Sequence, residues 1–93
     1  MRIISRRTLR EFVAARAGYK NQPVKAALDA WFAEVSKADW KSTVDVKRLY
    51  ATASIVSADR IVFNIKGNDY RLVVAVDFEK AIVWIKWVGS HRD

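Results

Sequence analysis

Residues 60–88, RIVFNIKGNDYRLVVAVDFEKAIVWIKWV, decide the fold of this chain. Three apolar segments within the stretch have the alternating or continuous hydrophobic pattern of β-strands. A Gly-Asn-Asp turn signal at residues 67–69 separates the first two segments, and a second short turn is expected at Phe78-Glu79. The stretch therefore predicts three consecutive antiparallel strands.

Alternation along these strands predicts which side chains share a face of the sheet. Hairpin loops with an even number of residues place even-numbered residues of the first strand beside odd-numbered residues of the second. The opposite, apolar set must be covered by helices, and it consists of Ile61, Phe63, Ile65, Tyr70, Leu72, Val74, Val76, Ala81, Val83, Ile85 and Trp87. Asn64 and Lys66 then lie beside Arg71, and Lys86 is expected in the same cross-strand row as Asn64 and Arg71.

Two helices are expected between a short edge strand at residues 1–5 and the three consecutive strands. Apolar residues recur at helical spacing over residues 5–17, and Gly18 is a typical helix stop. A second helix begins near Pro23. Its apolar face is formed by Val24, Ala27, Leu28, Trp31, Phe32 and Val35. Residues 38–59 have no sustained period and predict an ordered loop with room for a short strand or turn.

These elements predict a single α+β domain over residues 1–93. Their order, β-α-α-β-β-β, places the two helices on one face of an antiparallel sheet of about four strands. The length suffices for one compact core, and a hydrophobic content of 52% is too high for a disordered chain.

Composition and charge restrict the location and the partners of the protein. Apolar stretches are only a strand long, the N-terminus lacks the apolar core of a signal peptide, and there is no cysteine. We therefore expect a cytoplasmic protein without membrane contacts. Seventeen Lys and Arg against ten Asp and Glu leave a net charge of +7, which favours nucleic acid, a ribosome or an acidic protein as a partner.

The expected cationic row is the first candidate binding site. Like charges on adjacent strands repel one another unless an anion lies between them. Lys66, Arg71 and Lys86 with the amide of Asn64 are therefore typical of a phosphate site, although a solvated sheet face also accommodates lysine and arginine. Trp84 is expected on the same face, where its ring offers a plane for base stacking.

His91 is the single histidine of the chain and directly follows the third strand. An imidazole at that position can transfer protons near neutral pH, although a lone histidine near a terminus is often an incidental surface residue. The sequence contains no Gly-rich phosphate loop, no cysteine nucleophile and no set of metal ligands, so no metal or other cofactor is expected.

The hairpin FNIKGNDYRLVV, residues 63–74, and the segment VDFEKAIVWIKWVGSHRD, residues 76–93, resemble the HigB family of type II toxin–antitoxin toxins. This family lies within the RelE-like superfamily of mRNA interferases. The resemblance covers the chain in element order and is specific from residue 45 onward, where DVKRLY also matches. It implies a RelE-like fold, with two helices packed on one side of a small sheet.

The resemblance implies an endoribonuclease that cuts messenger RNA in the ribosomal decoding site and so inhibits translation. Metal independence is expected because the sequence has no set of metal ligands. The RNA 2′-hydroxyl attacks the neighbouring phosphate. The protein therefore needs to orient that oxygen, neutralise charge on the phosphorane and protonate the leaving 5′-oxygen. A HigA-type helix-turn-helix antitoxin is the implied partner, and the toxin–antitoxin complex is implied to bind operator DNA.

Three residues have catalytic roles by the resemblance. Arg71 matches the strand arginine of the YRL motif and is expected to stabilise charge in the transition state. Lys66 corresponds to a lysine that supports proton transfer or phosphate binding, and His91 is the implied general acid.

Further residues are expected to bind RNA. Asn64 and Asn68 match the FNxxGN pattern and are implied to position sugar or phosphate. Lys86 is a secondary electrostatic contributor, and Trp84 is the stacking candidate on the same face. Family members continue after the histidine as His-x-x-Tyr-Asp, whereas this sequence ends at Asp93. We therefore expect either a piece of a longer chain or a shortened form with weaker activity.

Two other functions agree with the residues alone. A non-catalytic RNA- or ribosome-binding module would need the same positive charge and exposed aromatic ring. A protein-interaction module that meets an acidic partner would also be basic, but it would show little salt-sensitive affinity for RNA. New 5′-hydroxyl ends on RNA distinguish the nuclease from both.

Overall fold

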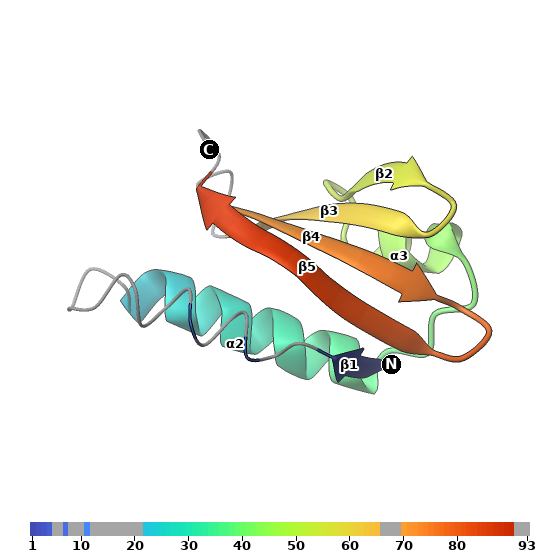
Figure 1. Cartoon of the computed structure of the whole chain (residues 1–93), viewed down its shortest axis with the longest axis horizontal. Helices are drawn as coiled ribbons and strands as arrows, with labels where there is room; N and C mark the ends of the chain where they lie inside the picture. Colours follow the sequence, from blue (N-terminus) through green and yellow to red (C-terminus); the bar gives the residue numbers. More distant parts are fainter. Residues whose placement is uncertain (5–6, 8–10, 12–21, 66–69, 91–93) are drawn as a thin grey trace.

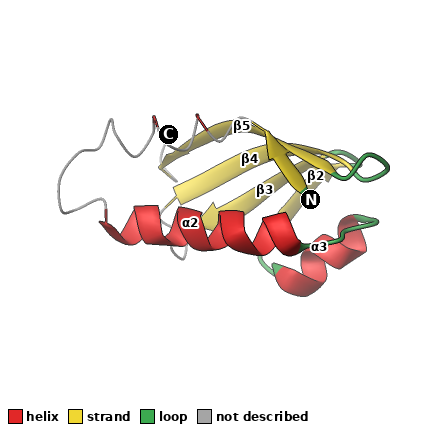
Figure 2. Ribbon diagram, turned by 90° about the horizontal axis from the view of Figure 1, so that it is seen from below, coloured by secondary structure: helices red, strands yellow, loops and turns green. Residues whose placement is uncertain are grey.

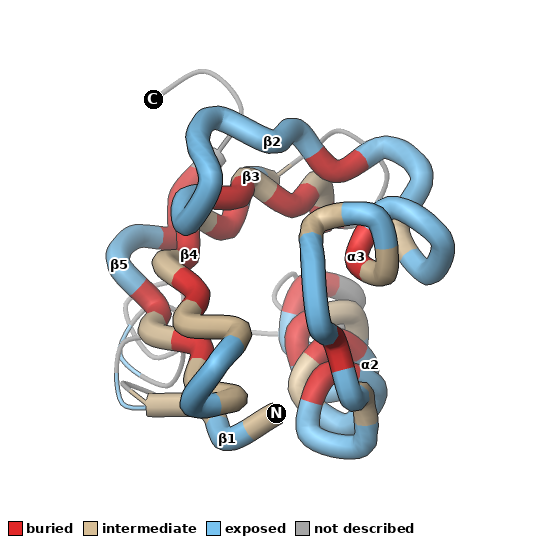
Figure 3. Tube along the Cα trace, turned by 90° about the vertical axis from the view of Figure 1, so that its right-hand side faces the viewer, coloured by how far each residue is buried: buried red, intermediate tan, exposed pale blue. Residues whose placement is uncertain are grey.

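The computed structural model describes residues 1–4, 7, 11, 22–65 and 70–90 (Figure 1). Their elements follow in the order β1 (Arg2–Ile4), α2 (Gln22–Lys37), α3 (Thr43–Leu49), β2 (Ser54–Ser57), β3 (Arg60–Ile65), β4 (Tyr70–Asp77) and β5 (Ile82–Ser90). The strands form a sheet in the order β1-β5-β4-β3-β2, and α2 and α3 lie on the same side of it (Figure 3). The predicted two-layer α+β fold is therefore confirmed.

The three predicted consecutive strands are β3, β4 and β5, which pair antiparallel. The predicted strand at the N-terminus is β1, which forms one edge of the sheet and runs parallel to β5. The sheet is thus mixed rather than wholly antiparallel. A fifth strand, β2, forms the other edge within the stretch predicted as a loop. All four of its residues are exposed, so no alternating apolar face marks it in the sequence.

Helix α2 carries the predicted apolar stripe and covers one face of the sheet. Val24, Leu28, Trp31 and Val35 are buried, while Phe32 is partly buried against the core. Figure 2 shows α2 crossing beneath β3, β4 and β5. Each fully buried side chain of this size contributes about 1.5–3 kcal/mol relative to an exposed one. Packing on the sheet therefore accounts for most of the stability of this helix.

An aromatic cluster joins the two helices to the centre of the sheet. The ring of Phe63 on β3 lies 5.5 Å from Trp31 of α2, 6.1 Å from Trp40 and 5.1 Å from Tyr50, measured between ring centroids. The contacts with Trp31 and Tyr50 are edge-to-face, and the contact with Trp40 is stacked. Burial, and secondarily the nearby Glu34 carboxylate, raises the pKa of Tyr50 above its ordinary value of 10.0.

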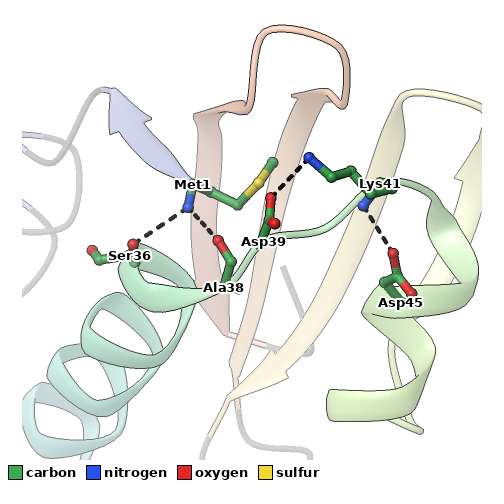
Figure 4. Close-up of polar contacts among 6 residues, drawn as sticks. All are labelled: Met1, Ser36, Ala38, Asp39, Lys41 and Asp45. Atoms are coloured by element: carbon green, nitrogen blue, oxygen red, sulfur yellow. Dashed lines mark hydrogen bonds and ion pairs between the residues drawn. The ribbon is translucent and has the colours of Figure 1, made fainter.

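Helix α3 was not predicted, because a helix of seven residues is too short to show a periodic stripe. Only Val46 among its residues is buried. The ends of the helix are held by polar contacts instead: the Asp45 carboxylate accepts a hydrogen bond from the backbone N–H of Lys41 at 2.8 Å (Figure 4). At the other end, Lys47 Nζ donates to the carbonyl oxygens of Ala51 and Ala53 at 2.6 and 2.8 Å.

The helix predicted over residues 5–17 lies outside the described residues except for two positions. Arg7 and Glu11 are helical and form an ion pair one turn apart, with 2.7 Å between Nε and Oε1. Among the described segments, no helix is long and apolar enough to cross a membrane.

The α-amino group of Met1 connects the start of β1 to the end of α2. It donates hydrogen bonds to the carbonyl oxygens of Ala38 at 2.6 Å and Ser36 at 3.3 Å (Figure 4). The last carbonyl groups of a helix have no partner within the helix and carry its negative dipole end. The ammonium group of Met1 therefore donates hydrogen bonds to carbonyl groups at this end of α2, and its positive charge offsets the negative end of the helix dipole.

A β-bulge in β5 changes which of its residues face the core. Val74 pairs with Ile85, whereas the adjacent Val73 pairs with Trp87, so Lys86 has no pairing partner in β4. The alternation is therefore reversed after Lys86, because one extra residue moves every following side chain to the other face. The predicted core position of Trp87 was wrong: Trp87 is exposed, and the next residue, Val88, is buried instead. Before the bulge, the predicted core positions Val83 and Ile85 are buried.

Candidate nucleic-acid interface

The candidate site lies on the outer face, by which we mean the face of β3, β4 and β5 turned away from α2 and α3. The core residues Phe63 and Leu72 lie opposite each other, so their strand neighbours Asn64 and Arg71 pair on the outer face. The predicted juxtaposition of Asn64 and Arg71 is therefore confirmed. The next residue across the sheet is Gly89 of β5.

Asn64 and Arg71 differ in how they present their polar groups. Arg71 is exposed on β4. Asn64 is half-buried, and its Nδ2 donates a hydrogen bond to the carbonyl oxygen of Thr52 at 3.1 Å. This bond ties the segment that precedes β2 to the edge of the site. The Nδ2 group of Asn64 thus binds the protein backbone beside Arg71.

Lys86 does not lie in the predicted row. The register pairs Arg71 with Gly89, and Lys86 is the extra residue of the bulge between Ile85 and Trp87. The prediction failed because it carried a regular alternation through a strand that contains a bulge. Lys86 is exposed, so its ammonium group contributes positive charge to this part of the surface without belonging to the row.

Among the described aromatic residues of the outer face, Trp87 rather than Trp84 lies nearest to Arg71 in the strand register. Trp84 pairs with Ala75, which is four residues from Arg71 on β4 and hence about 14 Å away at ~3.4 Å per residue. Trp87 pairs with Val73, which is two residues and about 7 Å from Arg71. Trp87 is 40% exposed, whereas Trp84 is half-buried.

Sequence reasoning placed Trp87 in the core and so missed it as a site residue. The glycine at position 89, inside a strand, was a sign that the strand is irregular there. A glycine inside a strand often marks a bulge or the close approach of another group. Gly89 shows both features: a bulge precedes it, and a Cβ atom at this position would overlap Cζ2 and Cη2 of Trp87.

Three predicted site residues lie outside the described residues. Lys66 and Asn68 belong to residues 66–69, and His91 belongs to residues 91–93. Their neighbours in the chain are described, since β3 ends at Ile65, β4 begins at Tyr70 and β5 ends at Ser90. These three described strand ends lie at the same end of the sheet as the Asn64–Arg71 pair.

The described part of the outer face is positive near Arg71. The carboxylate on the described part of this face belongs to Asp77, which lies at the opposite end of β4, six residues and about 20 Å from Arg71. There Asp77 Oδ1 accepts a hydrogen bond from the backbone N–H of Lys80 at 2.9 Å. Within the described ranges, no group of three or more His, Cys, Asp or Glu side chains is arranged to hold a metal ion.

These features define a small basic α+β domain that presents an arginine and a neighbouring indole on one sheet face. A family model for HigB_toxin, described as the RelE-like toxic component of a toxin–antitoxin system, matches residues 24–93. The chain therefore belongs to the HigB toxin family, as the hairpin and the C-terminal segment predicted. No curated protein matches the chain.

Proposed function

We propose that this chain is a ribosome-dependent mRNA endoribonuclease that inhibits translation and is neutralised by a cognate antitoxin. One observation carries the proposal. In a member of the HigB toxin family, the arginine of the YRL motif, Arg71, is exposed on the outer face directly opposite Asn64. A toxin family of this kind supports RNA cleavage in general, and the positive surface near Arg71 supports a polyanionic substrate.

The proposed reaction needs charge stabilisation and two proton transfers. The 2′-oxygen of the RNA forms a bond to phosphorus as its proton leaves, and the bond from phosphorus to the 5′-oxygen breaks as that oxygen gains a proton. The products are a 2′,3′-cyclic phosphate and a 5′-hydroxyl end. Arg71 stabilises the negative charge of the phosphorane, a role for which loss of one donor reduces the rate about 10²- to 10³-fold. Lys66 and His91 are proposed for the proton transfers.

The remaining predicted residues have supporting roles in this proposal. Asn64 and Asn68 position the sugar or phosphate, and Lys86 raises the local concentration of RNA through its charge. The reaction as proposed uses side chains only, without a metal ion. Trp84 was the sequence-based candidate for base stacking. Trp87 is a second candidate, because it lies nearer to Arg71 on the outer face.

Primer extension on a translated messenger in a ribosome-containing extract tests the proposal. The unsubstituted chain is expected to produce discrete cuts, and Arg71→Ala should weaken them at least 10²-fold. Arg60→Ala is the matched control, because it removes the same charge at a distance from the site. Arg60 is an exposed arginine of β3 that lies four residues from Asn64. Equal cutting by the chain and by Arg71→Ala would refute the catalytic assignment of Arg71.

The partner is proposed to be a HigA-type helix-turn-helix antitoxin, and the complex is proposed to bind operator DNA. The family implies an antitoxin in general. Co-expression of a cognate HigA-type antitoxin should abolish cutting in the extract and yield a stable complex on size exclusion. A protein that retards RNA but yields no 5′-hydroxyl ends would instead be a non-catalytic RNA-binding module.

A further inference from the structure

The indole of Trp87 lies over the backbone of Gly89. A Cβ atom built on Gly89 would overlap Cζ2 and Cη2 of Trp87 and would lie 3.2 Å from Cε2. Gly89 is buried, although it lies on the outer face of the sheet. The indole therefore covers this glycine, and only a residue without a side chain leaves room for the ring.

The bulge at Lys86 makes this arrangement possible. Without the extra residue, regular alternation would turn Trp87 into the core and Val88 outward. With it, Trp87 and Gly89 both lie on the outer face, and Trp87 is 40% exposed. One side of the ring is used to cover Gly89, so its exposed part is available to a flat ligand.

The position of the ring relative to Arg71 follows from the strand register. Gly89 is the direct partner of Arg71, and Cβ positions of opposite residues are about 4.5–5.5 Å apart. The six-membered ring of Trp87 occupies the Cβ position of Gly89, so it lies about 5 Å from the base of the Arg71 side chain. A nucleotide whose phosphate contacts Arg71 would bring its base within reach of the indole.

We propose that the Trp87 indole, seated over Gly89 beside Arg71, is the base-stacking surface for the RNA nucleotide whose phosphate Arg71 binds. The inference rests on the proposed function in taking RNA as the ligand of this face. Base–aromatic stacking tolerates any base, because each base has a π-face. The surface would therefore hold a nucleotide in place without selecting a sequence.

The charges around the ring favour RNA over an apolar protein segment. Lys86, the exposed lysine of the bulge, directly precedes Trp87, and exposed Arg71 lies across the strand from Gly89. An aromatic ring with an arginine on the neighbouring strand and an exposed lysine next to it in the chain matches the combination of stacking plane and phosphate-binding charge found in single-strand binding sites. An apolar partner would have to cover these cations and so lose their hydration.

Fluorescence anisotropy with a short labelled single-stranded oligoribonucleotide tests the inference. Trp87→Leu keeps an apolar cover on Gly89 but removes the aromatic plane, and it should weaken binding about tenfold. Trp87→Phe retains a ring and should recover most of the affinity. Leu49→Ala removes an exposed apolar side chain on α3 and is the control that should leave affinity unchanged. Circular dichroism of each variant verifies folding.

Salt dependence separates stacking from charge effects. Trp87→Leu should lower the affinity without changing the slope of log K against log salt, whereas Arg71→Ala should reduce that slope by about one. Unchanged RNA affinity in Trp87→Leu overturns the inference. This holds even if Trp87→Leu weakens binding of the antitoxin, because the indole would then contact the antitoxin and not RNA. Weaker binding by Trp84→Leu alone would overturn it as well, because the stacking surface would then be Trp84.

The outcomes distinguish this inference from the proposed function. Arg71-dependent cutting in the translation extract, with normal RNA affinity in Trp87→Leu, would leave the nuclease in place and remove the stacking surface. Tenfold weaker binding by Trp87→Leu without any cutting would leave the stacking surface in place and remove the nuclease.

Discussion

Replacement of Gly89 by alanine is expected to destabilise the protein only because Trp87 occupies the space of the new methyl group. The backbone of Gly89 does not have a positive φ, so alanine is compatible with its conformation. Alanine in a strand interior is otherwise favoured over glycine by about 0.5–1 kcal/mol. The sign of the effect therefore depends on the indole alone.

The magnitude follows from the area that Trp87 covers. Trp87 is 40% exposed, so about three fifths of its side chain is covered, which corresponds to about 90–150 Å² for a tryptophan. At about 25 cal/mol per Å², complete loss of this contact would cost about 2–4 kcal/mol. The displaced ring will cover other parts of the strand, so we expect a net loss of about 1–2 kcal/mol.

A double-mutant cycle measures this effect. The free energy of unfolding is determined by urea denaturation for the parent chain, Gly89→Ala, Trp87→Ala and the double variant. In the Trp87→Ala background, Gly89→Ala should stabilise by about 0.5–1 kcal/mol, because the overlapping ring is gone. The coupling free energy is then about 2 kcal/mol. An equal effect of Gly89→Ala in both backgrounds would refute the contact between the indole and Gly89.

Three further predictions concern stability. Tyr50 has a raised pKa in the folded protein, so the unfolded chain loses the tyrosine proton first and stability should fall as the pH rises above 10.0, by up to about 1.4 kcal/mol per pH unit. Urea titrations at alkaline pH should show this slope and should show it reduced in Tyr50→Phe; identical slopes would contradict the assignment. Acetylation of the Met1 α-amino group in the 93-residue chain removes the charge that bonds to Ser36 and Ala38, and should lower stability by about 1–2 kcal/mol in thermal unfolding. A melting curve unaffected by acetylation would show that these bonds contribute nothing. Ala81 has a φ of 58°, so Ala81→Gly should stabilise the turn between β4 and β5 by about 0.5–1 kcal/mol. Ala53→Gly is the control, because Ala53 is buried without a positive φ and should lose stability on the same change.

Local patterns in the sequence were sufficient for the elements whose side chains alternate or recur regularly. The core positions of β3 and β4, such as Phe63 and Leu72, follow from alternation because each strand has one face on the helices. The stripe of α2, including Trp31 and Val35, follows from the helical period for the same reason. The pairing of Asn64 with Arg71 needed only the parity of one hairpin. The family resemblance also rested on contiguous residues and was confirmed by the family match.

Other features depend on contacts between residues far apart in the sequence. Helix α3 holds a single buried residue, Val46, and β2 has none, so neither has a period that a sequence could display. The placement of Lys86 and Trp87 depends on the bulge in β5, which is defined only by the pairing of β5 with β4. By itself, the sequence determined β1, β3, β4 and β5, the main helix, the core face up to the bulge in β5, and the family. Only the tertiary structure decided that Trp87, rather than Lys86, lies beside Arg71, because one extra residue in a strand reverses every side chain that follows it.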